Sequence, residues 1–150
     1  MIYVDTSAIV KLYIKETDSL SISEWLKNNN EPIPLTSLIE LELINALKLK
    51  QFRKEISNED FEKINLKLRE HEERGVYYRP SMDWIGVFNY AFDLSKKHTA
   101  NIGSRSLDIL HVASALFLKK DIILTFDERQ AQLSSVAGLK IEKCPDASIH

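Results

Sequence analysis

Cysteine, glycine and proline are scarce in this sequence, and each shortage excludes a class of protein. Only Cys144 is present among the 150 residues, which rules out an internal disulfide and a cysteine-based zinc cluster. Four glycines and four prolines leave no linker rich in these residues, and there is no repeat or low-complexity tract. The sequence therefore predicts one globular domain that folds without disulfides or structural metal, as suits a reducing cytoplasm.

Long hydrophobic runs and a large charge of one sign are also missing. No segment approaches the roughly 18 consecutive apolar residues that span a bilayer, so we expect no membrane contact. Residues 1–5 contain no basic stretch ahead of an apolar run, and we therefore expect no signal peptide. The formal charge of -2 argues against a protein that coats nucleic acid, but it permits an enzyme that handles nucleic acid through metal ions and local basic patches.

Short apolar segments alternate with longer amphipathic stretches along the chain. Strands are predicted at residues 2–4, 33–35, 76–78, 122–126 and 139–141. Helices are predicted over residues 6–14, 18–26, 38–52, 57–74, 83–97, 105–118 and 128–136. This alternation predicts an α/β fold with parallel strand pairing and helices on both faces, in which ligands bind beyond the carboxyl ends of the strands.

Three aspartates occupy positions where such a fold would place a ligand site. Asp5 directly follows the strand at residues 2–4, and Asp127 directly follows the strand at residues 122–126. For each of these alone, the alternative is that the side chain caps the next helix. Asp108 lies near the start of a helix that is apolar nearly all round. A carboxylate there is costly unless it is paired, bound to metal, or favoured by the positive helix end.

The predicted helix at residues 38–52 contains two further acids, Glu40 and Glu42. They are two residues apart and point about 200° from each other, so one can face a site while the other faces elsewhere. Periodicity does not select between them, because both have apolar neighbours on their faces. Carboxylates that gather without histidine or thiolate partners suit a hard cation such as Mg²⁺ or Mn²⁺, which can assist displacement at a phosphate.

Four segments together resemble the PIN-domain ribonucleases, specifically the VapC-like toxins of type II toxin–antitoxin pairs. These segments are IYVDTSAIVKLY at residues 2–13, Ser37 with Glu42 and Ala46, DILHVASAL at residues 108–116, and LTFD at residues 124–127 followed by GLKI at residues 138–141. Each motif is short, but the four follow one another in the family's order and spacing over nearly the whole chain.

The resemblance implies a metal-dependent endoribonuclease that uses Mg²⁺ or Mn²⁺. The metal ligands and catalytic groups that it implies are Asp5, Glu42, Asp108 and Asp127. It selects Glu42 over Glu40, because the family's acid lies four residues before a small residue, here Ala46. It also implies a three-layer fold, with a central and mostly parallel sheet of four to five short strands flanked by helices.

The same resemblance implies partners and boundaries. We expect an RNA substrate, a homodimer, and a cognate antitoxin protein that blocks the toxin. We expect the protein in the cytoplasm, with a PIN-like nuclease domain over residues 1–142 and a C-terminal tail at residues 143–150.

Hydroxyl groups flank two of the predicted acids. Thr6 and Ser7 follow Asp5, and Thr125 lies two residues before Asp127. These hydroxyls are candidates to orient the carboxylates. The alternative for each is a helix cap or a turn at the end of a strand.

Basic and histidine side chains offer further candidates. Arg105 lies about one helical turn before Asp108 and can pair with an acid, touch a phosphate, or remain solvated. His111 shares the face of Asp108, and we interpret it as a core histidine with a satisfied hydrogen bond. Two basic runs can follow an RNA backbone or form solvated faces. They consist of Lys48, Lys50, Arg53 and Lys54, and of Lys96 and Lys97.

Three alternative functions can be weighed against the nuclease. A phosphatase with an aspartate nucleophile needs a second acid two residues after Asp5, where this chain has Ser7. A receiver-like module needs paired acids after the first strand and a late lysine at a strand end, where Thr6 and Asp127 stand instead. A non-catalytic or stand-alone PIN-like domain without an antitoxin stays open, although the presence of all four acids favours activity.

Overall fold

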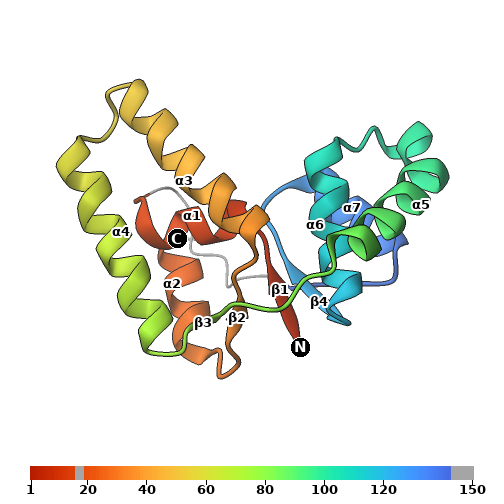
Figure 1. The fold of residues 1–150 in the computed structure, drawn as a ribbon, viewed down its shortest axis with the longest axis horizontal. Helices are drawn as coiled ribbons and strands as arrows, with labels where there is room; N and C mark the ends of the chain where they lie inside the picture. Colours follow the sequence, from red (N-terminus) through yellow and green to blue (C-terminus); the bar gives the residue numbers. More distant parts are fainter. Residues whose placement is uncertain (16–18, 143–150) are drawn as a thin grey trace, which may run out of the picture. The chain divides into compact units, whose positions relative to one another are not determined.

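The computed structural model describes residues 1–15 and 19–142, which fall into two compact units (Figure 1). Unit 1 combines Met1–Ala8 with Ser81–Lys143, and unit 2 contains Ile9–Pro80. The predicted tail at residues 143–150 and the first residue of the helix predicted from residue 18 lie outside the described residues. A single nuclease domain over residues 1–142 stays a prediction.

Unit 1 is built on a three-stranded parallel sheet in the order β1-β4-β5. Its strands are β1 (Ile2–Val4), β4 (Ile122–Leu124) and β5 (Lys140–Glu142). Val4 pairs with Leu124, so the carboxyl ends of β1 and β4 are adjacent. β1 is buried along its whole length, which explains its uniformly apolar sequence.

The helices of unit 1 are α5 (Trp84–Ile102), α6 (Ser106–Phe117) and α7 (Glu128–Val136). α5 packs on α6, α6 packs on α7, and α7 contacts β5. The predicted burial of α6 is confirmed, because its residues 108, 109 and 111–115 are buried. The helix therefore carries Asp108 into the interior of the unit.

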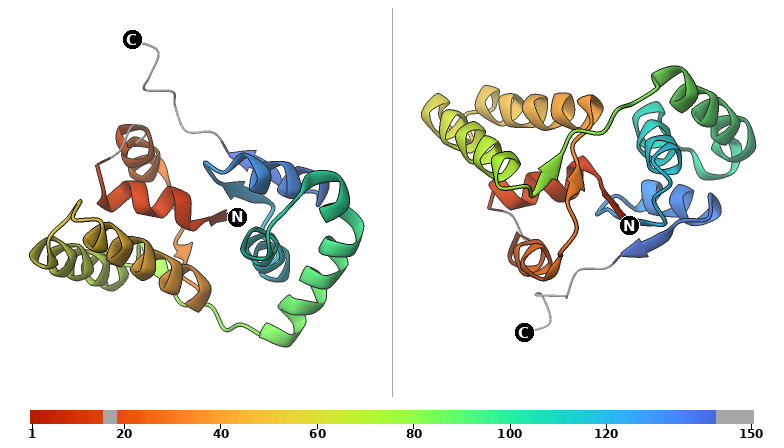
Figure 2. Two further views of the ribbon diagram at one scale, coloured as in Figure 1. Left: turned by 90° about the horizontal axis from the view of Figure 1, so that it is seen from above. Right: turned by 60° about the horizontal axis from the view of Figure 1, so that its bottom comes forward.

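Unit 2 contains a two-stranded parallel sheet of β2 (Ile33–Pro34) and β3 (Tyr77–Tyr78). Its helices are α2 (Ser19–Asn28), α3 (Ser37–Phe52) and α4 (Asn58–Glu73), while α1 (Thr6–Tyr13) begins in unit 1 and continues into unit 2. α3 and α4 lie side by side as a hairpin (Figures 1 and 2). The core side chains include Ile33, Leu35, Ile39, Leu43 and Leu47.

A hydrogen-bonded cluster joins three elements of unit 2. The Tyr13 hydroxyl of α1 lies 2.7 Å from Nδ1 of His71 on α4 and 2.8 Å from the hydroxyl of Tyr77 on β3. Burial lowers the pKa of His71, because desolvation disfavours the charged form of its ring. Each of these polar atoms thereby has a partner, as its burial demands.

The predicted α/β class with parallel pairing is confirmed, and the arrangement of the strands and two element ends differ from the prediction. The described strands divide into a sheet of three and a sheet of two. β4 ends at Leu124 rather than Phe126, because the Phe126 amide donates to the Ser7 hydroxyl instead of extending the strand. α5 continues to Ile102, past the predicted end at Lys97, because no glycine or proline occurs between Lys97 and Gly103. In α4, the predicted capping box of Ser57 and Asp60 is confirmed.

No helix among the described residues is long and apolar enough to cross a membrane.

Gly103 ends α5 in the left-handed backbone conformation, with φ of 74°. Gly103→Ala is expected to lower the free energy of unfolding by about 1 kcal/mol, because a Cβ disfavours this conformation. Urea denaturation measures the change. Asn101→Ala is the matched control, since residue 101 is exposed and has an ordinary helical backbone within α5. Equal stability of the Gly103→Ala protein and the wild type would contradict the prediction.

Candidate functional site

The carboxyl ends of β1 and β4 place Asp5 beside Thr125. The backbone N–H of Asp5 donates to the carbonyl of Leu124 at 3.1 Å, which continues the pairing of the two strands by one residue. The Asp5 side chain is only 2% exposed. The prediction that Asp5 directly follows a strand is therefore confirmed, and the parallel sheet brings residues from both ends of the sequence together.

Three donors hold the carboxylate of Asp5. Oδ1 accepts hydrogen bonds from the Ser7 hydroxyl at 2.6 Å and from the Ala8 amide at 3.2 Å, and Oδ2 accepts from the Thr125 hydroxyl at 2.6 Å. The bond from Ala8 is of the type that an N-cap residue receives, so the capping alternative and the ligand-site hypothesis both fit Asp5. The predicted proximity of Ser7 and Thr125 to the acid is observed.

The same two hydroxyls also accept hydrogen bonds, which fixes the direction in which they donate. The Phe126 amide donates to the Ser7 oxygen at 3.1 Å, and the Asp127 amide donates to the Thr125 oxygen at 3.0 Å. Each hydroxyl has one proton, and that proton is directed at Asp5. The arrangement therefore orients the Asp5 carboxylate and favours its ionised form.

Burial nevertheless raises the pKa of Asp5 above its ordinary value, because desolvation disfavours the charged carboxylate. The electrostatic interaction with His111 and the hydrogen bonds from Ser7, Thr125 and Ala8 lower the pKa and offset only part of this effect. A carboxylate that is costly to keep charged is one that a cation would stabilise.

A second group of polar side chains in unit 1 surrounds Arg105. The guanidinium lies 3.5 Å from Asp108 through Nε and 3.6 Å from Asp127 through a terminal nitrogen, and its side chain is 66% exposed. Asp108 is 6% exposed, and its carboxylate also accepts from the Arg105 amide at 3.2 Å. Of the alternatives weighed for Arg105, the structure thus supports pairing with acids.

Asp127 occupies the N-cap of α7, where its carboxylate accepts from the Gln130 amide at 3.0 Å. The prediction that it directly follows the strand is wrong, since β4 ends three residues earlier at Leu124. The reason is the turn over residues 125–126, where hydroxyl groups replace the strand's hydrogen-bond partners. Asp127 still joins the network, because its amide bonds to Thr125.

His111 is a core histidine with a satisfied hydrogen bond, as predicted. Its Nδ1 lies 2.8 Å from the hydroxyl of Tyr3, and its side chain is buried. Tyr3 was not identifiable as part of this network from the sequence, because an aromatic residue in a buried strand does not reveal where its hydroxyl points. Thr6 is half-buried at the start of α1, and its support of a carboxylate stays a prediction.

Glu42 belongs to α3 in unit 2, where its side chain is half-buried. The neighbouring Glu40 forms an ion pair with Arg79 at 2.5 Å, and Arg79 also binds Glu72 at 2.7 Å. Glu40 therefore has a structural role within unit 2. This is consistent with the selection of Glu42 as the functional acid, which stays a prediction.

The donors of unit 1 fit a hard divalent cation. They are carboxylate oxygens, which Mg²⁺ and Mn²⁺ prefer. A positive group, the guanidinium of Arg105, already lies near both Asp108 and Asp127. Among residues 1–15 and 19–142, no three acidic, histidine or cysteine side chains approach closely enough to form a metal cage.

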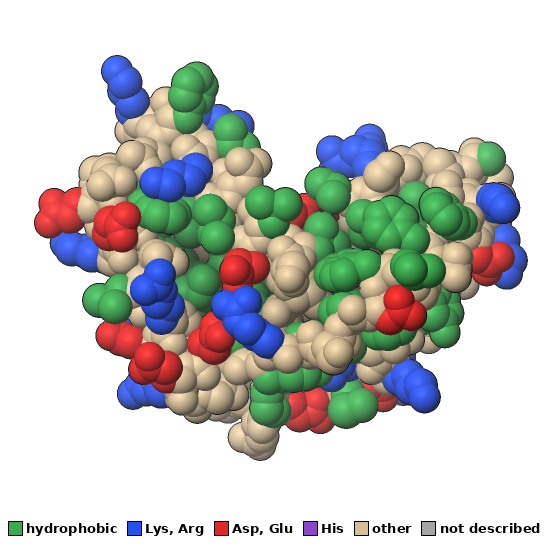
Figure 3. Space-filling view, in the orientation of Figure 1, with side chains coloured by type: hydrophobic (Ala, Val, Ile, Leu, Met, Phe, Trp, Pro, Cys, Tyr) green, Lys and Arg blue, Asp and Glu red, His purple; other side chains and the backbone are tan. Residues whose placement is uncertain are grey.

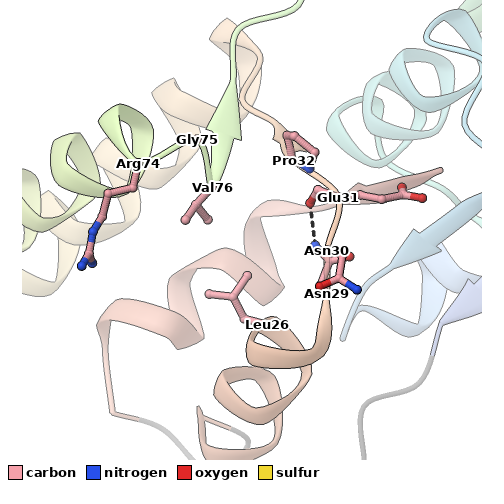
Figure 4. Close-up of a pocket in the computed structure, with 8 residues that line it drawn as sticks. All are labelled: Leu26, Asn29, Asn30, Glu31, Pro32, Arg74, Gly75 and Val76. Carbon is pink, nitrogen blue, oxygen red and sulfur yellow. Dashed lines mark hydrogen bonds between the residues drawn. The ribbon is translucent and has the colours of Figure 1, made fainter.

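A concavity of about 190 Å³ in unit 2 has a different character (Figure 4). Leu26 and Val76 point toward one another across it, whereas the guanidinium of Arg74 points away. The Asn29 amide donates to the carbonyl of Glu31 at 2.7 Å and thereby closes one edge. The residues that line it are mostly apolar or uncharged, with Glu31 and Arg74 as the ionisable ones.

Comparison with protein families assigns this architecture. A model of the PIN domain matches residues 2–136, so the chain belongs to the PIN domain family. The family prediction made from the four sequence motifs is confirmed. A comparison with curated protein sequences finds no match.

Solved structures show the same fold at low sequence identity. VapC20 of Mycobacterium tuberculosis, a toxin that cleaves the sarcin–ricin loop, is similar with a TM-score of 0.69 and 14% identity, over 97% of this chain and 100% of that one. FitAcB from Neisseria gonorrhoeae is similar with a TM-score of 0.66 and 15% identity, over 95% of this chain and 97% of that one. These likenesses establish the fold over nearly the full length of both chains.

Proposed function

We propose that this protein is a divalent-metal-dependent endoribonuclease that hydrolyses RNA phosphodiester bonds, and that it is the toxin of a type II toxin–antitoxin pair. The observation that carries the proposal is the buried carboxylate of Asp5, oriented by two hydroxyls at the carboxyl end of a parallel sheet. Membership of the PIN domain family and the likeness to the VapC20 toxin support it.

Several residues of unit 1 hold the carboxylates in fixed positions. Ser7 and Thr125 hold Asp5 in one orientation, because each directs its proton at the carboxylate. Asp127 is held at the N-cap of α7, and Asp108 is held at the start of α6. Rigid elements thereby present three carboxylates, and positioning of this kind lowers the entropic cost of a reaction.

The predicted ligands of Mg²⁺ or Mn²⁺ are Asp5, Asp108 and Asp127 of unit 1 together with Glu42. When bound, such an ion neutralises charge on the scissile phosphate and increases the acidity of water. Arg105 can bind a phosphate oxygen of the RNA, because its guanidinium is exposed and lies beside the carboxylates of Asp108 and Asp127. Its pairing with the two carboxylates is weak at that exposure, so an RNA phosphate can displace one of them.

The partners and the cellular location are part of the same proposal. The VapC-like motifs favour a homodimer and a cognate antitoxin protein, and they favour the cytoplasm as the place of action. Exposed apolar side chains on α5 support a protein-binding role, since such surfaces are commonly covered by partners. They are Ile85, Phe88 and Phe92, of which the last two are in ring contact.

A non-catalytic PIN-like binding domain is the second candidate. The observation that favours it is the position of Arg105, which gives Asp108 and Asp127 a cationic partner without any metal ion. Measurement of cleavage separates the two candidates.

Incubation of a structured RNA, such as a transfer RNA or a ribosomal RNA fragment, is expected to yield discrete fragments when Mn²⁺ or Mg²⁺ is present. Chelation with EDTA is expected to stop cleavage, because the carboxylates alone cannot neutralise the phosphate. The products are resolved on a denaturing gel, and an inhibitor of metal-independent ribonucleases controls for contamination. The outcome that would favour the non-catalytic domain is a protein preparation, freed of any inhibitor, in which the protein binds Mn²⁺ but cuts no RNA.

A further inference from the structure

The end of the α3–α4 hairpin in unit 2 combines an exposed aromatic ring with two basic side chains. Phe52 is the last residue of α3 and is 83% exposed. Arg53 caps the helix, and Lys54 follows it into the turn. We call these three residues the hairpin patch. In Figure 3, hydrophobic and basic side chains adjoin one another at this end of the hairpin.

Neither cation of the hairpin patch is neutralised by an acid among the residues that the structure describes. Within residues 1–15 and 19–142, Arg53 and Lys54 form no ion pair. The nearby acids are already engaged, since Glu55 pairs with Lys50 at 3.3 Å and Asp60 accepts from the Ser57 amide at 2.9 Å. The positive charge of the patch is therefore available to an external anion.

Lys54 occupies a backbone position that would suit glycine better. Its φ of 61° lies in the left-handed region. The amide of Lys54 donates to the carbonyl of Gln51 at 3.0 Å, and the amide of Glu55 donates to the carbonyl of Lys50 at 2.9 Å. These two bonds define a Schellman motif, in which glycine is the usual residue at the position of Lys54. A lysine there costs stability, and its side chain forms no ion pair within the described residues that offsets the cost.

An open concavity lies next to the patch. It has a volume of about 450 Å³, and Lys54 forms part of its wall. Gln51, Ser57 and Asn58 also line it and present amide and hydroxyl groups, and the carboxylates of Glu55 and Asp60, which are engaged as described above, complete its polar lining. Groups of this kind can bond the edge of a nucleobase, while the neighbouring cations attract a phosphate.

We propose that the hairpin patch binds single-stranded RNA, with a base stacked on Phe52 and adjacent phosphates held by Arg53 and Lys54. The inference rests on the proposed function, because it identifies this surface as a substrate-binding site. A flat aromatic ring beside two unneutralised cations matches a nucleic acid strand, which alternates planar bases with negative charges. An acidic peptide matches the charges but gives the ring no planar partner.

Binding is measured separately from cleavage, by fluorescence anisotropy of a labelled single-stranded oligoribonucleotide with EDTA present. Phe52→Ala is expected to weaken binding about 5-fold or more, since stacking of one base contributes that much. Arg53→Gln combined with Lys54→Gln is expected to reduce the slope of log affinity against log salt by about 1.4, because each phosphate that is no longer neutralised lowers the slope by about 0.7.

Matched controls separate the patch from general effects of charge and hydrophobicity. Lys63→Gln combined with Lys67→Gln removes two cations from α4, and Leu66→Ala trims an exposed apolar residue of the same helix. Both control proteins are expected to bind RNA like the wild type. Lys54→Gly is expected to raise the midpoint of urea unfolding yet weaken RNA binding. If Lys54 had a purely structural role, the same substitution would lower the midpoint of unfolding.

The possible outcomes are distinct. Unchanged binding in the patch variants, or equally weakened binding in the controls, overturns the inference even if the wild type cleaves RNA. Weakened binding in the patch variants alone supports it even if no cleavage is seen, in which case the proposed ribonuclease activity fails by itself. A labelled acidic peptide that binds the patch when RNA does not would also overturn it.

Discussion

Replacement of Asp5 by asparagine is expected to lower metal-dependent RNA cleavage about 100-fold or more, because it removes a charged ligand that two hydroxyls orient. The measurement is the initial rate of cleavage at saturating Mn²⁺. Asp93→Asn is the matched control, since it removes an exposed carboxylate of α5 that pairs with Lys97. An Asp5→Asn protein that cleaves as fast as the wild type would rule out the proposed mechanism.

The same variant separates a functional carboxylate from a structural one. Because burial raises the pKa of Asp5, the folded protein binds a proton at this site more tightly than the unfolded chain does. The contribution of Asp5 to stability therefore falls as pH rises from the ordinary aspartate pKa of 3.8 through the raised pKa of the folded protein. Without metal, Asp5→Asn is expected to be at least as stable as the wild type at neutral pH.

Denaturation in urea at a series of pH values tests this expectation, and added Mn²⁺ is expected to stabilise only the wild type. A large decrease in the stability of the metal-free variant at neutral pH would show that the charge of Asp5 holds the fold together instead.

Thr125→Val is expected to lower metal affinity and cleavage by about 10- to 100-fold, although residue 125 carries no charge. Valine keeps the shape of threonine but lacks the hydroxyl that donates to Asp5 and accepts from the Asp127 amide. The substitution leaves the Asp5 carboxylate and the Asp127 amide each without this partner. Where such a group is buried, the loss lowers the free energy of unfolding by roughly 1–3 kcal/mol. Mn²⁺-dependent stabilisation gives a measure of metal affinity that does not depend on catalysis.

Thr125→Ser is the control for this experiment, because it retains the hydroxyl and removes only a methyl group. It is expected to keep most of the metal affinity and activity of the wild type. If serine and valine impair the protein equally, packing of the methyl group rather than the hydrogen bonds would account for the impairment.

Much of unit 1 follows from local sequence patterns. The apolar segment at residues 2–4 predicts β1, and the nearly continuous apolar stretch after Asp108 predicts a buried α6. Parallel pairing then places Asp5 next to the residues that follow β4. Ser7 and Thr125 were identifiable as supporting hydroxyls because they flank predicted acids in the sequence.

The remaining features depend on contacts that the sequence does not encode locally. The distance from Arg105 to Asp127 is set by how α6 and α7 pack, so the interaction between them was not predictable from helix spacing. The early end of β4 depends on Ser7, a residue more than a hundred positions away along the chain. The ion pair of Glu40 with Arg79 likewise depends on the fold, because Arg79 lies in the loop that follows β3.

The pairing of β1 with β4 also has a consequence for biosynthesis. The hydroxyl of Thr125 meets Asp5 across 120 positions of sequence, so the sheet has a high contact order. On a ribosome, β1 emerges first and has no partner strand until β4 has been translated. The oriented state of Asp5 therefore cannot form on a nascent chain that ends before β4. The proposed ribonuclease would in this way stay inactive beside the ribosome that makes it until β4 has been translated.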